Sequence, residues 1–135
     1  MNTAEKLKHI DVGHVSFSEP LSFHCSWRIG GPADALVQPE SEEQILRLLE
    51  FVRGEGVPLL VIGRGTNILF PDGGIRGVVL KLGRRFSFFS FSGSRVRAKG
   101  GIWVPRLVRN LADAGLSGME HASGIPGSLG GLVAM

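Results

Sequence analysis

The sequence predicts one domain that contains both helices and strands. Its 135 residues suit a single hydrophobic core, since such cores usually span ~100 to 200 residues. Hydrophobic residues make up 43% of the chain and charged residues 20%, so a core can form and disorder is excluded as the main state. Two amphipathic segments with helical spacing are separated by short apolar runs of strand length, which is typical of a mixed fold.

The beginning of the chain predicts a polar lead followed by a turn and a strand. Residues 1–15 are interpreted as the lead, with one or two helical turns from Thr3, and the folded domain is expected over residues 16–135. A Gly-Gly-Pro turn at residues 30–32 precedes a short strand at residues 35–38.

The clearest helix signal follows at residues 41–53. Ser41 and Gln44 stand at the spacing of a capping box, in which side chains satisfy free backbone donors at the start of a helix. Apolar residues then recur every three or four positions, and Gly54 is expected to end the helix in a left-handed conformation.

Two strands are predicted in the middle of the chain. Residues 57–62 are nearly all apolar, which favours a strand covered on both faces, and they end at a glycine loop over residues 63–67. A Pro-Asp-Gly-Gly turn at residues 71–74 then leads to a strand at residues 75–82.

The last third predicts a hairpin, a helix and a glycine-rich segment. Residues 86–92 and 95–99 form the hairpin, and Pro105 and Gly115 frame a helix over residues 106–114. The chain stops within an apolar run, so we expect it to be the front part of a longer protein.

Two glycine clusters are candidate phosphate-binding segments. The loop over residues 63–67 has two glycines that free backbone amides, beside a hydroxyl and an amide side chain, and residues 124–131 have the same character. Neither cluster has the spacing of a P-loop or of the dinucleotide fingerprint. These features alone leave two interpretations open, a shared phosphate ligand and tight turns that bind nothing.

Composition and spacing exclude several other functions. The single cysteine, Cys25, rules out an internal disulfide and a cysteine-based metal site, and the scattered histidines predict no metal. His24 precedes Cys25, and adjacent side chains of an extended segment point to opposite faces. We therefore expect the Cys25 thiol to be buried and not to act as a nucleophile. No apolar run approaches the ~20 residues of a membrane helix, and the charged start is unlike a secretory signal, so we expect a soluble cytoplasmic protein.

The positive charge does not by itself identify a partner. A net charge of +3 suits an anionic ligand as well as nucleic acid. Arginines and phenylalanines are mixed over residues 84–99, as in proteins that stack bases on a sheet. Phenylalanines that alternate with serines are also what a half-buried strand needs, and we therefore expect no nucleic-acid partner.

Five segments in the same order resemble the family of UDP-N-acetylenolpyruvoylglucosamine reductases, flavoenzymes of peptidoglycan precursor synthesis. These segments are Ser26–Ala33, Gly63–Leu69, Gly74–Val78, Gly115–Glu120 and Gly124–Gly131. The resemblance implies an α+β fold, namely the FAD-binding domain of the vanillyl-alcohol-oxidase type, with two small α/β subdomains and FAD between them.

The resemblance also implies the residues that hold FAD, with the diphosphate against the two glycine clusters. The implied cofactor-binding residues are Ile62, Gly63, Arg64, Gly65, Thr66, Asn67, Ile68, Leu69, Gly100, Gly101, Gly124, Ile125, Pro126, Gly127, Ser128, Gly130 and Gly131. Whether Arg64 meets a phosphate or faces water stays open. The loop lacks the histidine that attaches FAD in some relatives, so non-covalent FAD is expected.

The reaction implied by the resemblance uses two further ligands. In this family NADPH reduces FAD, and the flavin passes a hydride to the enolpyruvyl group of a UDP-sugar to give UDP-N-acetylmuramate. The family's proton donor and its assisting residues lie in segments beyond Met135, so we assign no catalytic residue and expect this chain alone to be inactive. Another flavin oxidoreductase of the superfamily and a non-catalytic FAD or nucleotide-binding module remain alternatives, and the oligomeric state stays open.

Overall fold

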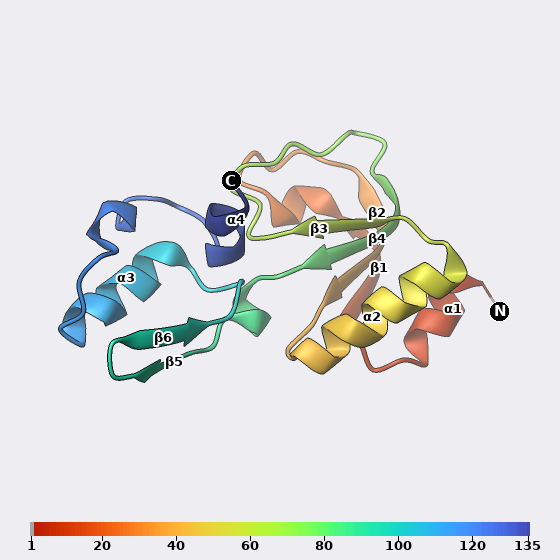
Figure 1. Cartoon of the computed structure of the whole chain (residues 1–135). Coiled ribbons are helices and arrows are strands. Elements are labelled where there is room, and N and C mark those ends of the chain that lie inside the picture. Colours follow the sequence, from red (N-terminus) through yellow and green to blue (C-terminus); the bar gives the residue numbers. More distant parts are fainter. Residues whose placement is uncertain (1) are drawn as a thin grey trace.

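The computed structural model describes residues 2–135, which form two lobes (Figure 1). The first lobe contains helices α1 (Thr3–Lys8) and α2 (Glu42–Glu55), a short helix η1 (Leu21–His24), and strands β1 (His14–Pro20), β2 (Pro32–Gln38), β3 (Leu59–Ile62) and β4 (Ile75–Lys81). The second lobe contains η2 (Arg84–Phe86), strands β5 (Phe89–Ser92) and β6 (Arg95–Ala98), helix α3 (Val104–Asp113), η3 (Glu120–Ala122) and helix α4 (Leu129–Ala134).

The four strands of the first lobe form one mixed sheet in the order β1-β2-β4-β3. Strand β1 is antiparallel to β2, while β4 runs parallel to both β2 and β3. The carboxyl ends of three parallel strands therefore meet at one edge of the sheet, near Gln38, Ile62 and Lys81. In sheets of this type ligands bind beyond the carboxyl ends of the strands. This edge faces the second lobe (Figure 1).

Each face of the sheet is covered by a different set of apolar side chains. Helices α1 and α2 lie along one face, and segment η1 lies on the opposite side (Figure 1). The first face packs Leu7, Val12, Leu48 and Val52 against Ala35, Val37, Val78 and Leu80. The second face packs Leu21, Cys25 and Phe70 against Ala33, Leu36, Ile62 and Val79. Cys25 is 8% exposed, which confirms the expected buried thiol.

The second lobe has a core of its own. Ile102, Leu107 and Leu111 pack with apolar side chains of the β5–β6 hairpin, while Val104 and Val108 pack with Ala122. Strands β5 and β6 pair antiparallel from Phe89 with Ala98 to Ser92 with Arg95, so the hairpin predicted from the sequence is confirmed. Pro105 lies in the first turn of α3, also as predicted.

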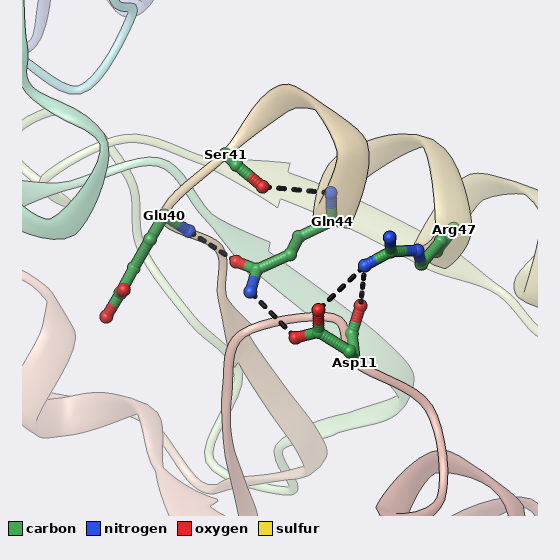
Figure 2. Close-up of polar contacts among 5 residues, drawn as sticks. All are labelled: Asp11, Glu40, Ser41, Gln44 and Arg47. Atoms are coloured by element: carbon green, nitrogen blue, oxygen red, sulfur yellow. Dashed lines mark hydrogen bonds and ion pairs between the residues drawn. The ribbon is translucent and has the colours of Figure 1, made fainter.

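Helix α2 begins with the side-chain contacts that its sequence predicts, with one difference. The Gln44 backbone N–H donates to Ser41 Oγ at 3.2 Å, which is the N-cap bond. The Gln44 side chain accepts from the Glu40 backbone N–H at 2.8 Å, one residue earlier than in a standard capping box (Figure 2). It also donates to Asp11 Oδ1, and Arg47 pairs with Asp11 Oδ2 at 2.7 Å. The cap thus ties α2 to the N-terminal segment.

Several sequence-based boundaries were wrong. Gly56, with φ of 64°, ends α2 in the left-handed conformation that we expected at Gly54, because the helix continues to Glu55. Strand β3 begins at Leu59 and lies at the sheet edge, where Val61 is 52% exposed, so it is not covered on both faces. Strand β1 and helix α4 were not predicted.

Candidate functional site

A cavity of about 410 Å³ lies between the two lobes. One wall is the carboxyl end of β3 and the loop that follows it, residues 61–68, and the other is residues 125–128 with the start of α4. The full lining is Val61, Ile62, Gly63, Arg64, Gly65, Thr66, Asn67, Ile68, Ile125, Pro126, Gly127, Ser128, Gly131, Leu132 and Met135. The fold thus brings together the two glycine clusters, which are about 60 residues apart in the chain.

The loop over residues 63–67 presents a run of backbone donors without protein acceptors. Within residues 2–135, no backbone N–H of this loop donates to a protein carbonyl or side chain. Gly65 is a buried residue of the cavity wall, and backbone N–H groups of buried segments normally have a hydrogen-bond partner. Successive free amides of this kind make a binding site for an anionic group such as a phosphate.

Close approach of backbone explains the glycines of this loop. A Cβ on Gly63 would lie 2.2 Å from Ser128 Oγ, and a Cβ on Gly65 would lie 1.8 Å from the His24 carbonyl oxygen. Gly65 also has φ of 75°, which disfavours other residues. Gly65 therefore cannot carry a side chain without a change of backbone, and a side chain at residue 63 would require Ser128 Oγ to move.

Backbone hydrogen bonds hold the second glycine segment in place. Gly130 N–H donates to the Gly100 carbonyl at 2.8 Å, and Val104 N–H donates to the Gly127 carbonyl at 2.9 Å. Ser128 is 4% exposed, and its Oγ accepts from Gly131 N–H at the start of α4. These contacts fix the wall that faces the loop.

Arg64 connects the lobes through its side chain. Its Nε donates to the Gly101 carbonyl at 3.0 Å, and its guanidinium lies over the Trp103 ring, with Cζ 5.7 Å from the ring centroid. Burial lowers the pKa of Arg64, and the nearby positive charges of Arg84 and Arg106 lower it further. The guanidinium is therefore a positive charge fixed at the rim of the cavity.

Comparison with known proteins identifies the family. A sequence family described as a FAD binding domain matches residues 33–135. The chain belongs to this FAD-binding domain family. The match covers both walls of the cavity, so the free amides and the glycine segments lie inside the FAD-binding domain.

Relatives of known name are similar over nearly the whole chain. UDP-N-acetylenolpyruvoylglucosamine reductase of Clostridioides difficile (strain 630) is 46% identical over 121 residues, which cover 90% of this chain and 40% of that protein. The sequence resemblance to this reductase family is thereby confirmed. The chain spans about two fifths of the length of the curated relatives it matches.

Solved structures confirm the fold class. The reductase of the same type from Thermus caldophilus superposes with a TM-score of 0.67 at 31% identity, covering 89% of this chain and 40% of that chain. An alkyldihydroxyacetonephosphate synthase superposes with a TM-score of 0.70 at 21% identity, covering 98% of this chain and 28% of that one, which is a likeness of fold alone. The α+β FAD-binding domain of the vanillyl-alcohol-oxidase type is therefore the fold of this chain.

The predicted cofactor-binding residues of the FAD-binding domain do not all line the cavity. Leu69 is 67% exposed and lies outside the lining, as do Gly124 and Gly130. Gly100 and Gly101 instead support the walls, since their carbonyls accept from Gly130 N–H and Arg64 Nε. Three lining residues, Val61, Leu132 and Met135, were not predicted, because apolar residues in apolar runs carry no signal of a ligand site.

Next to the cavity, a polar chain of three side chains was also missed. Lys81 Nζ donates to His24 Nδ1 at 2.9 Å, and His24 Nε2 lies 2.8 Å from Glu19 Oε1. Because an ammonium group can only donate, Nδ1 accepts and the ring proton lies on Nε2, from which it is donated to Glu19. Burial lowers the pKa of Lys81, and the charge of Arg64 lowers it further.

Neither a cluster of metal-ligating side chains nor a membrane-spanning helix is found in the described part of the chain. Among residues 2–135, no three His, Cys, Asp or Glu side chains gather closely enough to hold a metal ion. Over the same described range, no helix has both the length and the apolar character needed to cross a bilayer.

Proposed function

We propose that this chain is the FAD-binding portion of a UDP-N-acetylenolpyruvoylglucosamine reductase. In the complete enzyme, NADPH would be the reductant and the UDP-linked enolpyruvyl sugar the substrate, with UDP-N-acetylmuramate as the product. The 46% identity to the Clostridioides difficile reductase over 90% of this chain supports this assignment. The cytoplasm, where sugar nucleotides and NADPH are available, is the proposed location.

The free amides of residues 63–67 are the observation that carries the cofactor assignment. A diphosphate is doubly anionic and needs several donors in a small volume, which successive backbone N–H groups supply. The opposing segment, residues 125–128, adds the Ser128 hydroxyl and small residues that permit close approach. These residues fit the diphosphate of FAD, and the absence of a histidine in the loop favours a non-covalent cofactor.

We propose the cavity-lining members of the predicted set as the residues that hold FAD. Loop residues 63–67 and residues 126–128 would bind the diphosphate and orient the nucleotide, while Ile62, Ile68 and Ile125 would exclude water from it. Bound FAD supplies hydride transfer between the reductant and the substrate. Gly100, Gly101 and Gly130 would act by supporting these walls, whereas Leu69 and Gly124 are exposed outside the lining.

The domain division stays a proposal. We place the FAD-binding domain at residues 16–135 and the lead at residues 1–15. Leu7 and Val12 of that lead are fully buried against the sheet, so the lead packs as part of the first lobe and would be needed for its stability.

The activity is tested with the full-length protein loaded with FAD. Oxidation of NADPH is followed by absorbance with the UDP-enolpyruvyl sugar as the acceptor, and with buffer and UDP-N-acetylglucosamine as controls. Oxidation that depends on the enolpyruvyl sugar and yields UDP-N-acetylmuramate would support the proposal. Bound FAD without this turnover would instead favour another oxidoreductase of the same superfamily.

A further inference from the structure

A surface depression lined by positive charges lies beside the cavity and is distinct from it. It has a volume of about 540 Å³ and is lined by Gln38, Arg64, Lys81, Gly83, Arg84 and Arg85. Among these residues, only Arg64 also lines the cavity between the lobes. Gln38 and Lys81 are the last residues of β2 and β4, so the depression lies at the carboxyl edge of the parallel strands, where ligands bind.

Three of these cations, which we call the basic cluster, are Arg64, Lys81 and Arg84. Within residues 2–135, no carboxylate lies within 4.0 Å of any of them, whereas Arg85 pairs with Glu40 at 3.1 Å. Glu19 reaches Lys81 only through the ring of His24. The charges of the basic cluster are therefore not neutralised by a direct ion pair.

The members of the basic cluster are close enough to repel one another. The pKa of Lys81 is lowered first by burial, then by the charge of Arg64 and least by that of Arg84, while the charge of Glu19 opposes these effects. Arg84 also lowers the pKa of Arg64. Keeping the partly buried Arg64 and Lys81 next to another positive charge costs free energy, and a bound anion would reduce that cost.

We propose that Arg64, Lys81 and Arg84 bind a phosphate group of a second ligand, separate from the diphosphate of FAD. A guanidinium gives planar, paired donors to phosphate oxygens, and an ammonium gives a compact charge, so the two types together suit a tetrahedral dianion. Arg64 lies between the two sites and would orient both ligands relative to each other. The proposal rests on this cluster of charges and does not depend on the reductase reaction.

The test is a calorimetric titration of the full-length, FAD-loaded protein with inorganic pyrophosphate at constant ionic strength. We expect saturable binding that FAD does not displace. Lys81→Met and Arg84→Gln should each weaken pyrophosphate binding by about tenfold or more, because each variant loses one charged hydrogen bond to the anion. Arg95→Gln removes an equal charge from the hairpin and is the matched control, expected to change affinity less than about twofold.

Any of three results would overturn the proposal. These results are the absence of saturable pyrophosphate binding, a loss of pyrophosphate affinity in Arg95→Gln equal to that in the cluster variants, and displacement of pyrophosphate by FAD. Arg84 is exposed, so its variant keeps the test valid if Lys81→Met fails to fold. The titration is repeated without FAD, so a failure of FAD binding is separated from a failure of the phosphate site.

Competition then identifies the source of the phosphate. Displacement of pyrophosphate by NADP⁺ but not by NAD⁺ would support the proposal and assign the 2′-phosphate of the reducing nucleotide. Displacement by UDP would support it and assign the diphosphate of the sugar nucleotide.

Discussion

Gly63 lies so close to Ser128 that a Cβ on Gly63 would approach Ser128 Oγ to 2.2 Å. The glycine follows β3 in the first lobe, and the serine precedes α4 in the second. The two walls of the cavity approach each other closely at this contact. A methyl group at residue 63 would therefore require the Ser128 side chain to move away from the loop.

Gly63→Ala should destabilise the protein and weaken FAD binding. The added methyl group would force the loop and Ser128 apart, and overpacking of this kind costs about 1–3 kcal/mol in the free energy of unfolding. Urea unfolding and FAD titration of the variant measure the two effects.

The control for this variant is Gly54→Ala, because a Cβ on Gly54 would meet open space on helix α2. That change should be neutral or stabilise by about 0.5–1 kcal/mol. Adding Ser128→Ala to Gly63→Ala removes the Oγ and leaves the Ser128 Cβ 3.3 Å away, so it should restore part of the loss. A double variant no better than Gly63→Ala would refute the role of this contact.

Ser41→Ala should lower the free energy of unfolding by about 1 kcal/mol, since it removes the N-cap acceptor of α2. The lost bond is the one from the Gln44 backbone N–H to Ser41 Oγ (Figure 2). Ser94→Ala is the comparison, because Ser94 is exposed in the hairpin turn. Equal unfolding midpoints in urea for the two variants would contradict the prediction.

The stability of the protein should depend on the charge of Lys81. Its pKa is lowered in the folded state, so between that pKa and the ordinary lysine pKa the unfolded chain binds more protons. Stability from this group therefore rises with pH in that window and is lowest when both states are protonated. The free energy of unfolding of wild type relative to Lys81→Met should increase as the pH rises toward the ordinary lysine pKa of about 10.4. A constant or falling difference would contradict this sign.

Local signals in the sequence predicted the parts of the fold that depend on neighbouring residues. Ser41 and Gln44 begin a helix through contacts within one turn, and Gly93, with φ of 60°, closes the hairpin between paired Ser92 and Arg95. Strand β1 was missed because its pairing depends on β2, about 20 residues further along the chain. Helix α4 was missed because two glycines interrupt a short segment that is held by Ser128 and by packing.

The same distinction applies to the candidate site. The glycine clusters were visible because glycine is the residue that close backbone approach requires, as at Gly65. The chain of Glu19, His24 and Lys81 was not visible, since its last two members are 57 residues apart and meet only when the sheet edge forms. Arg64 was placed in the loop, but its contact with Gly101 across the lobes could not be predicted from the sequence.

The most direct test of the FAD site is a titration of the flavin-free 135-residue chain with FAD, followed by quenching of flavin fluorescence, with FMN as the control. If the free amides of residues 63–67 and the facing segment hold the diphosphate, FAD should bind saturably, FMN should not, and Gly63→Ala should weaken binding. Equal affinity for FAD and FMN, or FAD affinity unchanged in Gly63→Ala, would contradict the account.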